Sequence, residues 1–188
     1  NEALKNLLLR PDLDENGYRS SHSVVLAYAA CGIASLMGWI SEGTFYKLSM
    51  AAFLHDITLP SDEIAKVQSM PEFSLRRSQF SEEEMAAFMR HTDAAAELLA
   101  CLPEVPANVD VILRQHHEQP DGKGFPKCLT YAQLSPLSCV FIVAHRMLNL
   151  EVGTDTKDQL LQFLGQLGPE YEKGTFGKIV NSIRLAVV

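Results

Sequence analysis

Apolar residues recur along most of the chain at three- and four-residue spacing, and no stretch alternates apolar and polar residues for long enough to predict a strand. Ser81 and Glu84 have the spacing of a capping box, which marks the start of a helix. The pattern predicts long helices over residues 18–39, 43–56, 81–102, 106–117 and 130–150, a short helix opening at Ser61 and two more beyond residue 154. The chain has no internal repeat and no linker, so these helices predict an all-α single domain.

The chain has 188 residues, of which 47% are hydrophobic, and this size and composition fit one globular domain with a sizeable core. No apolar run reaches the roughly 18 residues that a membrane span needs. Sixteen Lys and Arg residues oppose 23 Asp and Glu residues, and the net charge of −7 argues against nucleic-acid binding, which rests on clustered cations. A small anionic substrate remains open if a metal supplies positive charge locally.

The four cysteines are widely spaced and form no C-x-x-C pair. Three of them lie in apolar surroundings, so we expect buried thiols in a reducing compartment. The chain begins at Asn1 and shows no secretory leader. We therefore expect a cytoplasmic protein, and a chain that is part of a longer protein with an N-terminal regulatory domain.

Six histidines carry the candidate chemistry: one lies in or beside each main predicted helix, and two form the doublet His116-His117. Neutral imidazole is the commonest metal ligand in proteins. His55 is followed by Asp56 at a predicted helix end, and a carboxylate there could bridge two ions while the histidines each bind one. A single histidine on an apolar helix is more often a hydrogen-bonded core residue. The metal site therefore rests on the whole set and on the glycine-containing loop after the doublet.

Two segments resemble a known family. Residues 51–57, Ala-Ala-Phe-Leu-His-Asp-Ile, resemble the HD signature of metal-dependent phosphohydrolases. Residues 116–126, His-His-Glu-Gln-Pro-Asp-Gly-Lys-Gly-Phe-Pro, are similar to the HHE-x-x-DG-x-G-Y-P segment of the HD-GYP subfamily. The resemblance covers about 18–150 and implies a helical bundle of HD-domain type over 18–188, with its catalytic core over 18–150, after a helical segment or turn over 1–17.

The HD-GYP subfamily hydrolyses the bacterial second messenger cyclic di-GMP with two or three iron or manganese ions. The resemblance therefore implies a metal-dependent phosphodiesterase in which Asp56 is the catalytic, bridging carboxylate. Tyr18 stands where the three-metal members have a glutamate, so we expect two ions; His145 stands where the family has an aspartate ligand. The implied metal ligands are His22, His55, Asp56, His91, His116, His117 and His145.

The substrate implied by the resemblance is a small cyclic dinucleotide. Lys157 matches a basic position that contacts substrate in the family, and we add the loop residues Asp121, Gly122 and Lys123 as substrate-binding residues. The loop over 119–126 is also the surface at which we expect a protein partner.

Several positions depart from the family pattern. Leu59 stands where the family has its catalytic lysine, Phe125 replaces the tyrosine of GYP, and Cys139 and Thr154 stand where arginines are usual. We therefore expect slow turnover. The alternative is a catalytically silent signalling module that binds a cyclic dinucleotide or a protein partner and keeps the metal site for stability. A third hypothesis, a phosphohydrolase for another nucleotide, shares the ligands but leaves the Gly-Phe-Pro loop unexplained.

Overall fold

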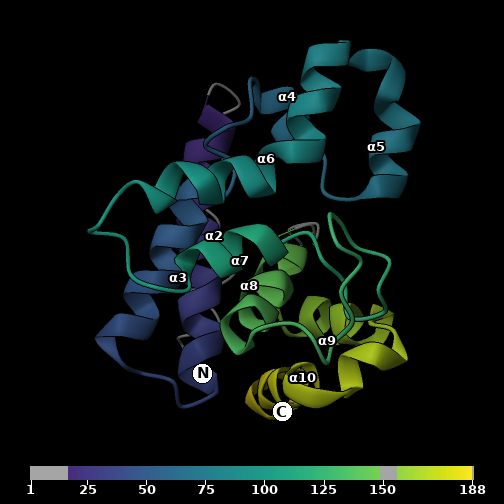
Figure 1. Cartoon of the computed structure of the whole chain (residues 1–188). Helices are drawn as coiled ribbons and strands as arrows, with labels where there is room; N and C mark the ends of the chain where they lie inside the picture. Colours follow the sequence, from purple (N-terminus) through teal and green to yellow (C-terminus); the bar gives the residue numbers. More distant parts are fainter. Residues whose placement is uncertain (1–16, 149–155, 188) are drawn as a thin grey trace.

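Helices build the described part of the chain, which in the computed structural model is residues 17–148 and 156–187 (Figure 1). Within these ranges no strand forms, and an isolated β-bridge joins Asp121 to Thr130. The prediction of an all-α domain is confirmed, whereas the segment predicted over 1–17 falls outside the described residues except for Gly17. The elements are α2 (Tyr18–Leu36), α3 (Glu42–Leu54), α4 (Asp62–Ala65), α5 (Met70–Arg76), η2 (Arg77–Gln79), α6 (Glu82–Ala100), α7 (Val109–Gln115), α8 (Pro136–Met147), α9 (Thr156–Gln166), η3 (Pro169–Glu172) and α10 (Gly174–Val187).

Serine caps mark the starts of α6 and α5. The Ser81 hydroxyl accepts the Glu84 N–H and the Glu84 carboxylate accepts the Ser81 N–H, so the predicted capping box is confirmed. The sequence pattern does not predict α5, which forms in a polar segment because Ser69 caps it and Pro71 lies in its first turn. Arg76 ends this helix and is ion-paired with Glu72.

Two helices are shorter than their apolar spacing predicts. α7 covers only part of 106–117, because Asn108 adopts a left-handed backbone with φ 76° just before it and the chain leaves the helix after Gln115. α8 begins at Pro136 rather than near residue 130, because Ser135 caps the helix there. The early end of α7 leaves the histidine doublet outside regular helix, with His116 as the C-cap residue.

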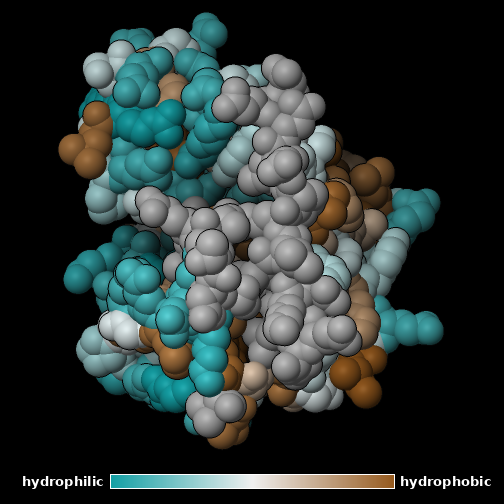
Figure 2. Space-filling view, turned by 180° about the vertical axis from the view of Figure 1, so that it is seen from behind, coloured by the Kyte–Doolittle hydropathy of each residue, from teal (hydrophilic) through white to brown (hydrophobic). Residues whose placement is uncertain are grey.

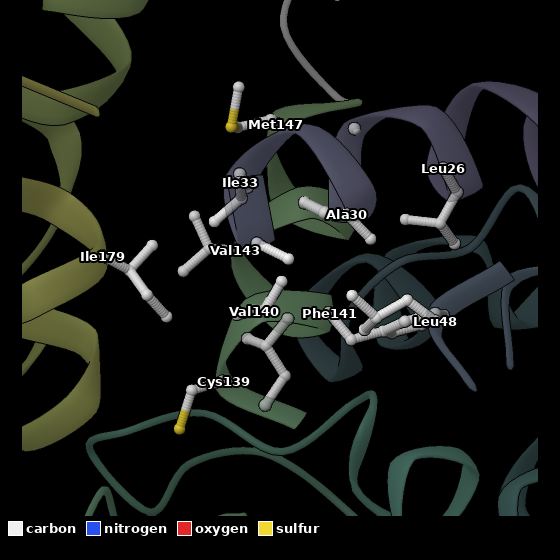
Figure 3. Close-up of a cluster of buried hydrophobic side chains, with 14 of the residues drawn as sticks. Leu26, Ala30, Ile33, Leu48, Cys139, Val140, Phe141, Val143, Met147 and Ile179 are labelled. Carbon is white, nitrogen blue, oxygen red and sulfur yellow. The ribbon is translucent and has the colours of Figure 1, made fainter. Parts of the chain in front are cut away.

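The main core lies where α8 packs against α2, α7 and α10 (Figure 3). Phe141 and Val143 of α8 share one buried cluster with Ile33 of α2, Leu48 of α3 and Ile179 of α10. Buried alanines on α2 and α3 let these two helices pack closely. One core thus fixes α2 and α8, which carry the first and last histidines, and α3, which the second histidine follows.

A second apolar cluster is formed by residues of α4, α5, α6 and the segments next to them. Its members are Leu59, Ile64, Ala65, Val67, Phe73, Phe80, Phe88 and Phe125. Leu59 is only 4% exposed, so the position at which the resemblance expects a catalytic lysine packs in a core. Phe125 brings the loop after the histidine doublet into the same cluster.

The cysteines are less buried than their apolar neighbours predict. Only Cys139 is buried among the four; Cys31 is partly exposed, and Cys101 and Cys128 are exposed. Neighbouring residues in sequence point to different sides of a helix or turn, so apolar neighbours do not ensure burial. Burial raises the pKa of the Cys139 thiol to about 12, which keeps it protonated and unreactive.

The surface seen from behind is hydrophilic over much of its upper part, where α4 and α5 lie, and more hydrophobic along its right side (Figure 2). Exposed apolar side chains include Val24 and Tyr28 of α2, Phe53 of α3 and Ile57 in the turn after α3. Among the described helices, none combines the length and the apolar character needed to cross a membrane.

Candidate metal centre

Seven buried side chains meet where α2, α3, α6, α7 and α8 converge. α2 carries one histidine, α6 a second and α8 a third, while a His-Asp pair follows α3 and a His-His pair follows α7. None of the seven is more than 7% exposed. The structure thus brings together every residue that the sequence predicts as a ligand: His22, His55, Asp56, His91, His116, His117 and His145.

The seven residues form two groups, in each of which the candidate ligand atoms lie within 4.8 Å of one another. One group is Asp56, His91, His116 and His117; the other is His22, His55 and His145. Asp56 lies between them, because its Oδ1 is 3.7 Å from His91 Nε2 and its Oδ2 is 3.1 Å from His55 Nε2. A carboxylate in this place can contribute one oxygen to each group.

Three of the imidazole rings are fixed by the carbonyl three residues earlier in the chain. His55 Nδ1 lies 2.8 Å from Ala52 O, His91 Nδ1 lies 2.5 Å from Phe88 O, and His116 Nδ1 lies 2.7 Å from Leu113 O. A carbonyl oxygen can only accept, so the hydrogen sits on Nδ1 and each Nε2 carries a lone pair. Metal-ligating histidines have the same arrangement, in which one ring nitrogen donates to the protein and the other faces the ion.

The lone pairs of His91 and His116 face each other. Their Nε2 atoms are 3.1 Å apart in a buried site, and neither carries a hydrogen in the tautomer that its carbonyl partner requires. Two lone pairs at this distance repel unless a cation lies beside both. Two imidazoles bound at about 2.1 Å and at right angles to one ion would be about 3.0 Å apart, so the observed separation fits a shared metal.

The second group also contains an imidazole nitrogen without a partner. His145 Nε2 is buried and has no hydrogen-bond partner. Buried polar atoms are almost always hydrogen-bonded, so an orphaned nitrogen beside two further histidines fits a bound cation. The set of six imidazoles and one carboxylate suits iron or zinc more than magnesium or calcium, which prefer oxygen ligands.

Asp56 is ionised in this setting. Burial raises its pKa, but the neighbouring His55, His91 and His116 outweigh burial, so the pKa of Asp56 lies well below its usual value. The effect is reciprocal for His55: burial lowers its pKa, and Asp56 more than compensates, so the pKa of His55 is raised. In the absence of a metal, Asp56 therefore favours the protonated form of His55.

Four further histidines, His91, His116, His117 and His145, are neutral near pH 7. Burial, followed by repulsion from neighbouring imidazoles, holds the pKa values of His116, His117 and His145 well below the usual range, and burial also lowers the pKa of His91. The neutral ring is the form that binds metals. These four side chains are therefore ready to bind a cation without first losing a proton.

Glu118 holds the loop that follows the histidine doublet. Its side chain is 1% exposed, and its two oxygens accept the N–H groups of Lys127 and Leu129, each at 2.7 Å. Gly124 is required by close packing: a Cβ at that position would lie 2.3 Å from Gln119 N. The loop therefore closes tightly against the chain just after the doublet.

Phe125 supports one of the histidines directly. Its ring stacks on the His117 ring, with centroids 4.5 Å apart and an interplanar angle of 16°, and its N–H donates to His117 O. The phenylalanine that replaces the family's tyrosine thus keeps the aromatic contact with the site but has no hydroxyl to offer a substrate.

A cavity of about 290 Å³ opens beside the two histidine groups. His116, His117 and His145 form one wall, and Arg146 lies next to them. The remaining lining comes from the segment before and within α5, the start of the loop, α9 and η3: Gln68, Ser69, Glu72, Glu118, Gln119, Ile142, Phe163, Gln166 and Tyr171. A second opening reaches Asp56 between α2 and α3.

The residues predicted to bind substrate do not line this cavity. Asp121 and Lys123 pair with each other at 3.4 Å in the loop, and Lys157 is exposed at the start of α9. Thr154 lies outside the described residues. Sequence reasoning missed Arg146, although its place directly after a candidate ligand was the available signal.

Comparisons with known proteins identify the family and the fold. A family model described as the HD domain matches residues 14–153. Among solved structures, Bd1817, an HDG"Y"P protein from Bdellovibrio bacteriovorus, is similar with a TM-score of 0.58 and 18% sequence identity; the match covers 97% of this chain and 61% of that one. At this identity the likeness concerns the fold. No curated protein matches the chain.

Proposed function

The chain belongs to the HD domain family, whose members are metal-dependent phosphohydrolases, and on this basis we propose that it is a phosphodiesterase of HD-GYP type that hydrolyses cyclic di-GMP. The His-His-Glu doublet followed by the Gly-Phe-Pro loop supports the subfamily, as does a fold shared with an HDG"Y"P protein. We further propose that the helical domain over 18–188 holds two iron or manganese ions.

The two residue groups would each hold one ion. Asp56, His91, His116 and His117 would bind the first, and His22, His55 and His145 the second, with Asp56 reaching both. When bound, such ions act as Lewis acids that stabilise the charge on a phosphoryl group and lower the pKa of water. Tyr18 supports two ions rather than three, because its hydroxyl lies 3.3 Å from His22 Nδ1 and it brings no carboxylate.

The chain's own residues would bind and position the substrate. The scissile phosphate would bind at the wall of the cavity formed by His117 and His145. Leu59 cannot protonate the leaving oxygen, and slow turnover is the expected consequence. Asp121, Gly122, Lys123 and Lys157 would contact parts of the dinucleotide that extend beyond the cavity.

The observation that carries the proposal is the 3.1 Å contact between His91 Nε2 and His116 Nε2, two nitrogens that both lack a hydrogen. The test is a hydrolysis assay on cyclic di-GMP with protein saturated in turn with iron and manganese. Asp56→Asn should abolish linear product, and Asp110→Asn, a matched change on α7 outside both cavities, should not. No product from the metal-saturated protein would refute the assignment of this substrate.

The second candidate is a binding module without turnover, and the burial of Leu59 favours it. Such a module would bind cyclic di-GMP in the metal-loaded form and leave it intact over hours. The protein partner expected at the loop 119–126 belongs to this hypothesis. Binding and hydrolysis measured on the same sample separate the two functions.

A further inference from the structure

The cavity beside the metal centre contains an arginine whose positive charge is not neutralised. Within the described residues, no carboxylate oxygen lies within 4.0 Å of the Arg146 guanidinium; its polar contact is with the Tyr171 hydroxyl, at 3.5 Å. By contrast, Arg19, Arg76, Arg114 and Arg184 are all ion-paired. Arg146 is half-buried and directly follows His145, so its charge lies at the wall that the histidines form.

Tyr171 fixes the direction of this arginine. The guanidinium carbon lies 5.4 Å from the centre of the Tyr171 ring, a cation–π contact. Tyr171 is itself 5% exposed and packs edge-on against Phe176, with ring centroids 5.2 Å apart. Arg146 therefore rests on an immobile aromatic platform, which reduces the entropy lost when it binds a ligand.

The acidic residues of the same cavity are already engaged. Glu118 accepts two backbone N–H groups of the loop. Glu72 accepts the Gln68 N–H at 2.9 Å and pairs with Arg76 at 3.3 Å. The oxygens of both carboxylates are thus already hydrogen-bonded, whereas Arg146, next to the candidate metal ligands, is a cation of the cavity lining with no carboxylate partner.

We propose that Arg146 is a substrate-binding residue whose guanidinium binds the phosphoryl oxygens of a phosphate ester, and that Tyr171 positions it. Arg146 supplies a cation in a chain where Leu59 and Thr154 replace the basic residues that the resemblance expects. Its planar fork suits two oxygens of one phosphate group. The proposal deepens the proposed function, since it names a group that binds the substrate of that site.

The test uses the metal-loaded protein and inorganic phosphate as the probe, with binding measured by calorimetry. Arg146→Gln should weaken phosphate binding by about 10- to 100-fold, the usual effect of losing charge-assisted hydrogen bonds. The phosphate affinity of Arg146→Lys should lie between that of Arg146→Gln and that of the wild type, because lysine keeps the positive charge but lacks the planar pair of donors. Arg77→Gln, an exposed arginine outside the cavity, should bind phosphate like the wild type. Metal content should be equal in all four proteins.

Kinetics on cyclic di-GMP give the second measurement. Arg146→Gln should raise KM more than it lowers kcat. Tyr171→Leu should also raise KM, but by a smaller factor, because Arg146 remains and loses only its support. Unchanged phosphate binding in Arg146→Gln, or no phosphate binding by the wild type, would overturn the proposal even if the enzyme is active. Arginine-dependent phosphate binding in a protein that leaves cyclic di-GMP intact would support Arg146 and refute the proposed substrate.

Discussion

Replacing Glu118 by Gln is expected to loosen the loop after the histidine doublet. The carboxylate accepts the N–H groups of Lys127 and Leu129, both at 2.7 Å, from a position that is 1% exposed. A glutamine keeps one accepting oxygen and turns an NH₂ group towards the other N–H, so one charged hydrogen bond is lost and the second becomes neutral. Hydrogen bonds to charged groups contribute about 1.5–3 kcal/mol each.

The expected loss of stability is about 2–3 kcal/mol, because both bonds are only partly buried and water can replace part of what is lost. For a chain of this size, each kcal/mol lowers Tm by about 2–4 °C. We therefore expect Glu118→Gln to lower Tm by about 4–12 °C. Thermal unfolding of the metal-loaded protein measures this directly.

Local loosening can be separated from global instability by limited trypsin digestion. Lys123 and Lys127 are both exposed in the loop, and cleavage after them should be faster in Glu118→Gln at a temperature where the protein remains folded. Because Phe125 of the loop stacks on His117, metal affinity should fall as well, by about 10- to 100-fold. Glu97→Gln, an exposed glutamate on α6, is the matched control. Equal Tm and equal cleavage in the two variants would refute the role given to Glu118.

The burial of Leu59 predicts that Leu59→Lys lowers the free energy of unfolding by about 2–5 kcal/mol and does not increase hydrolysis. The control Leu185→Lys, at a 71% exposed position, should unfold in urea nearly like the wild type. A Leu59→Lys enzyme that is as stable as the wild type and faster would contradict this prediction. The lowered pKa values of His116, His117 and His145 predict that the metal-free protein is less stable at pH 5.5 than at pH 7.5. As pH falls below about 6.5, these histidines take up protons in the unfolded chain but not in the folded one, and each such proton costs about 1.4 kcal/mol per pH unit. His55, whose pKa is raised, opposes this trend but is one residue against three. Equal urea midpoints at the two pH values would show that the three histidines are protonated in the folded protein.

The cluster of candidate metal ligands could be predicted from the sequence because histidines are few in the chain and the two motifs that carry the family resemblance contain half of them. The doublet and the His-Asp pair stand at helix ends, where two neighbouring residues can reach one site. Arg146 could not be predicted in this way. Its place directly after His145 is the one local signal, and its role depends on a cavity lined by residues of α5, α9 and η3, which the sequence does not reveal.

For the fold as well, features set by local interactions could be predicted, and features set by tertiary packing could not. The Ser81 capping box is a local interaction and was found correctly, whereas α5 depends on a serine cap and on Phe73 packing into the second cluster. The burial of Leu59 shows the same limit, because a resemblance in sequence aligns positions but does not determine which way a side chain faces.

The most direct test of the account is the metal content of the wild-type protein and of two histidine variants, purified without chelator and analysed for iron and manganese. The two groups of ligands predict about two ions per chain in the wild type. His91→Ala, in the group with Asp56, and His145→Ala, in the other group, should each lose about one ion and keep the helical content of the fold. A folded wild-type protein with no bound metal, or two variants that keep both ions, would contradict the existence of this centre.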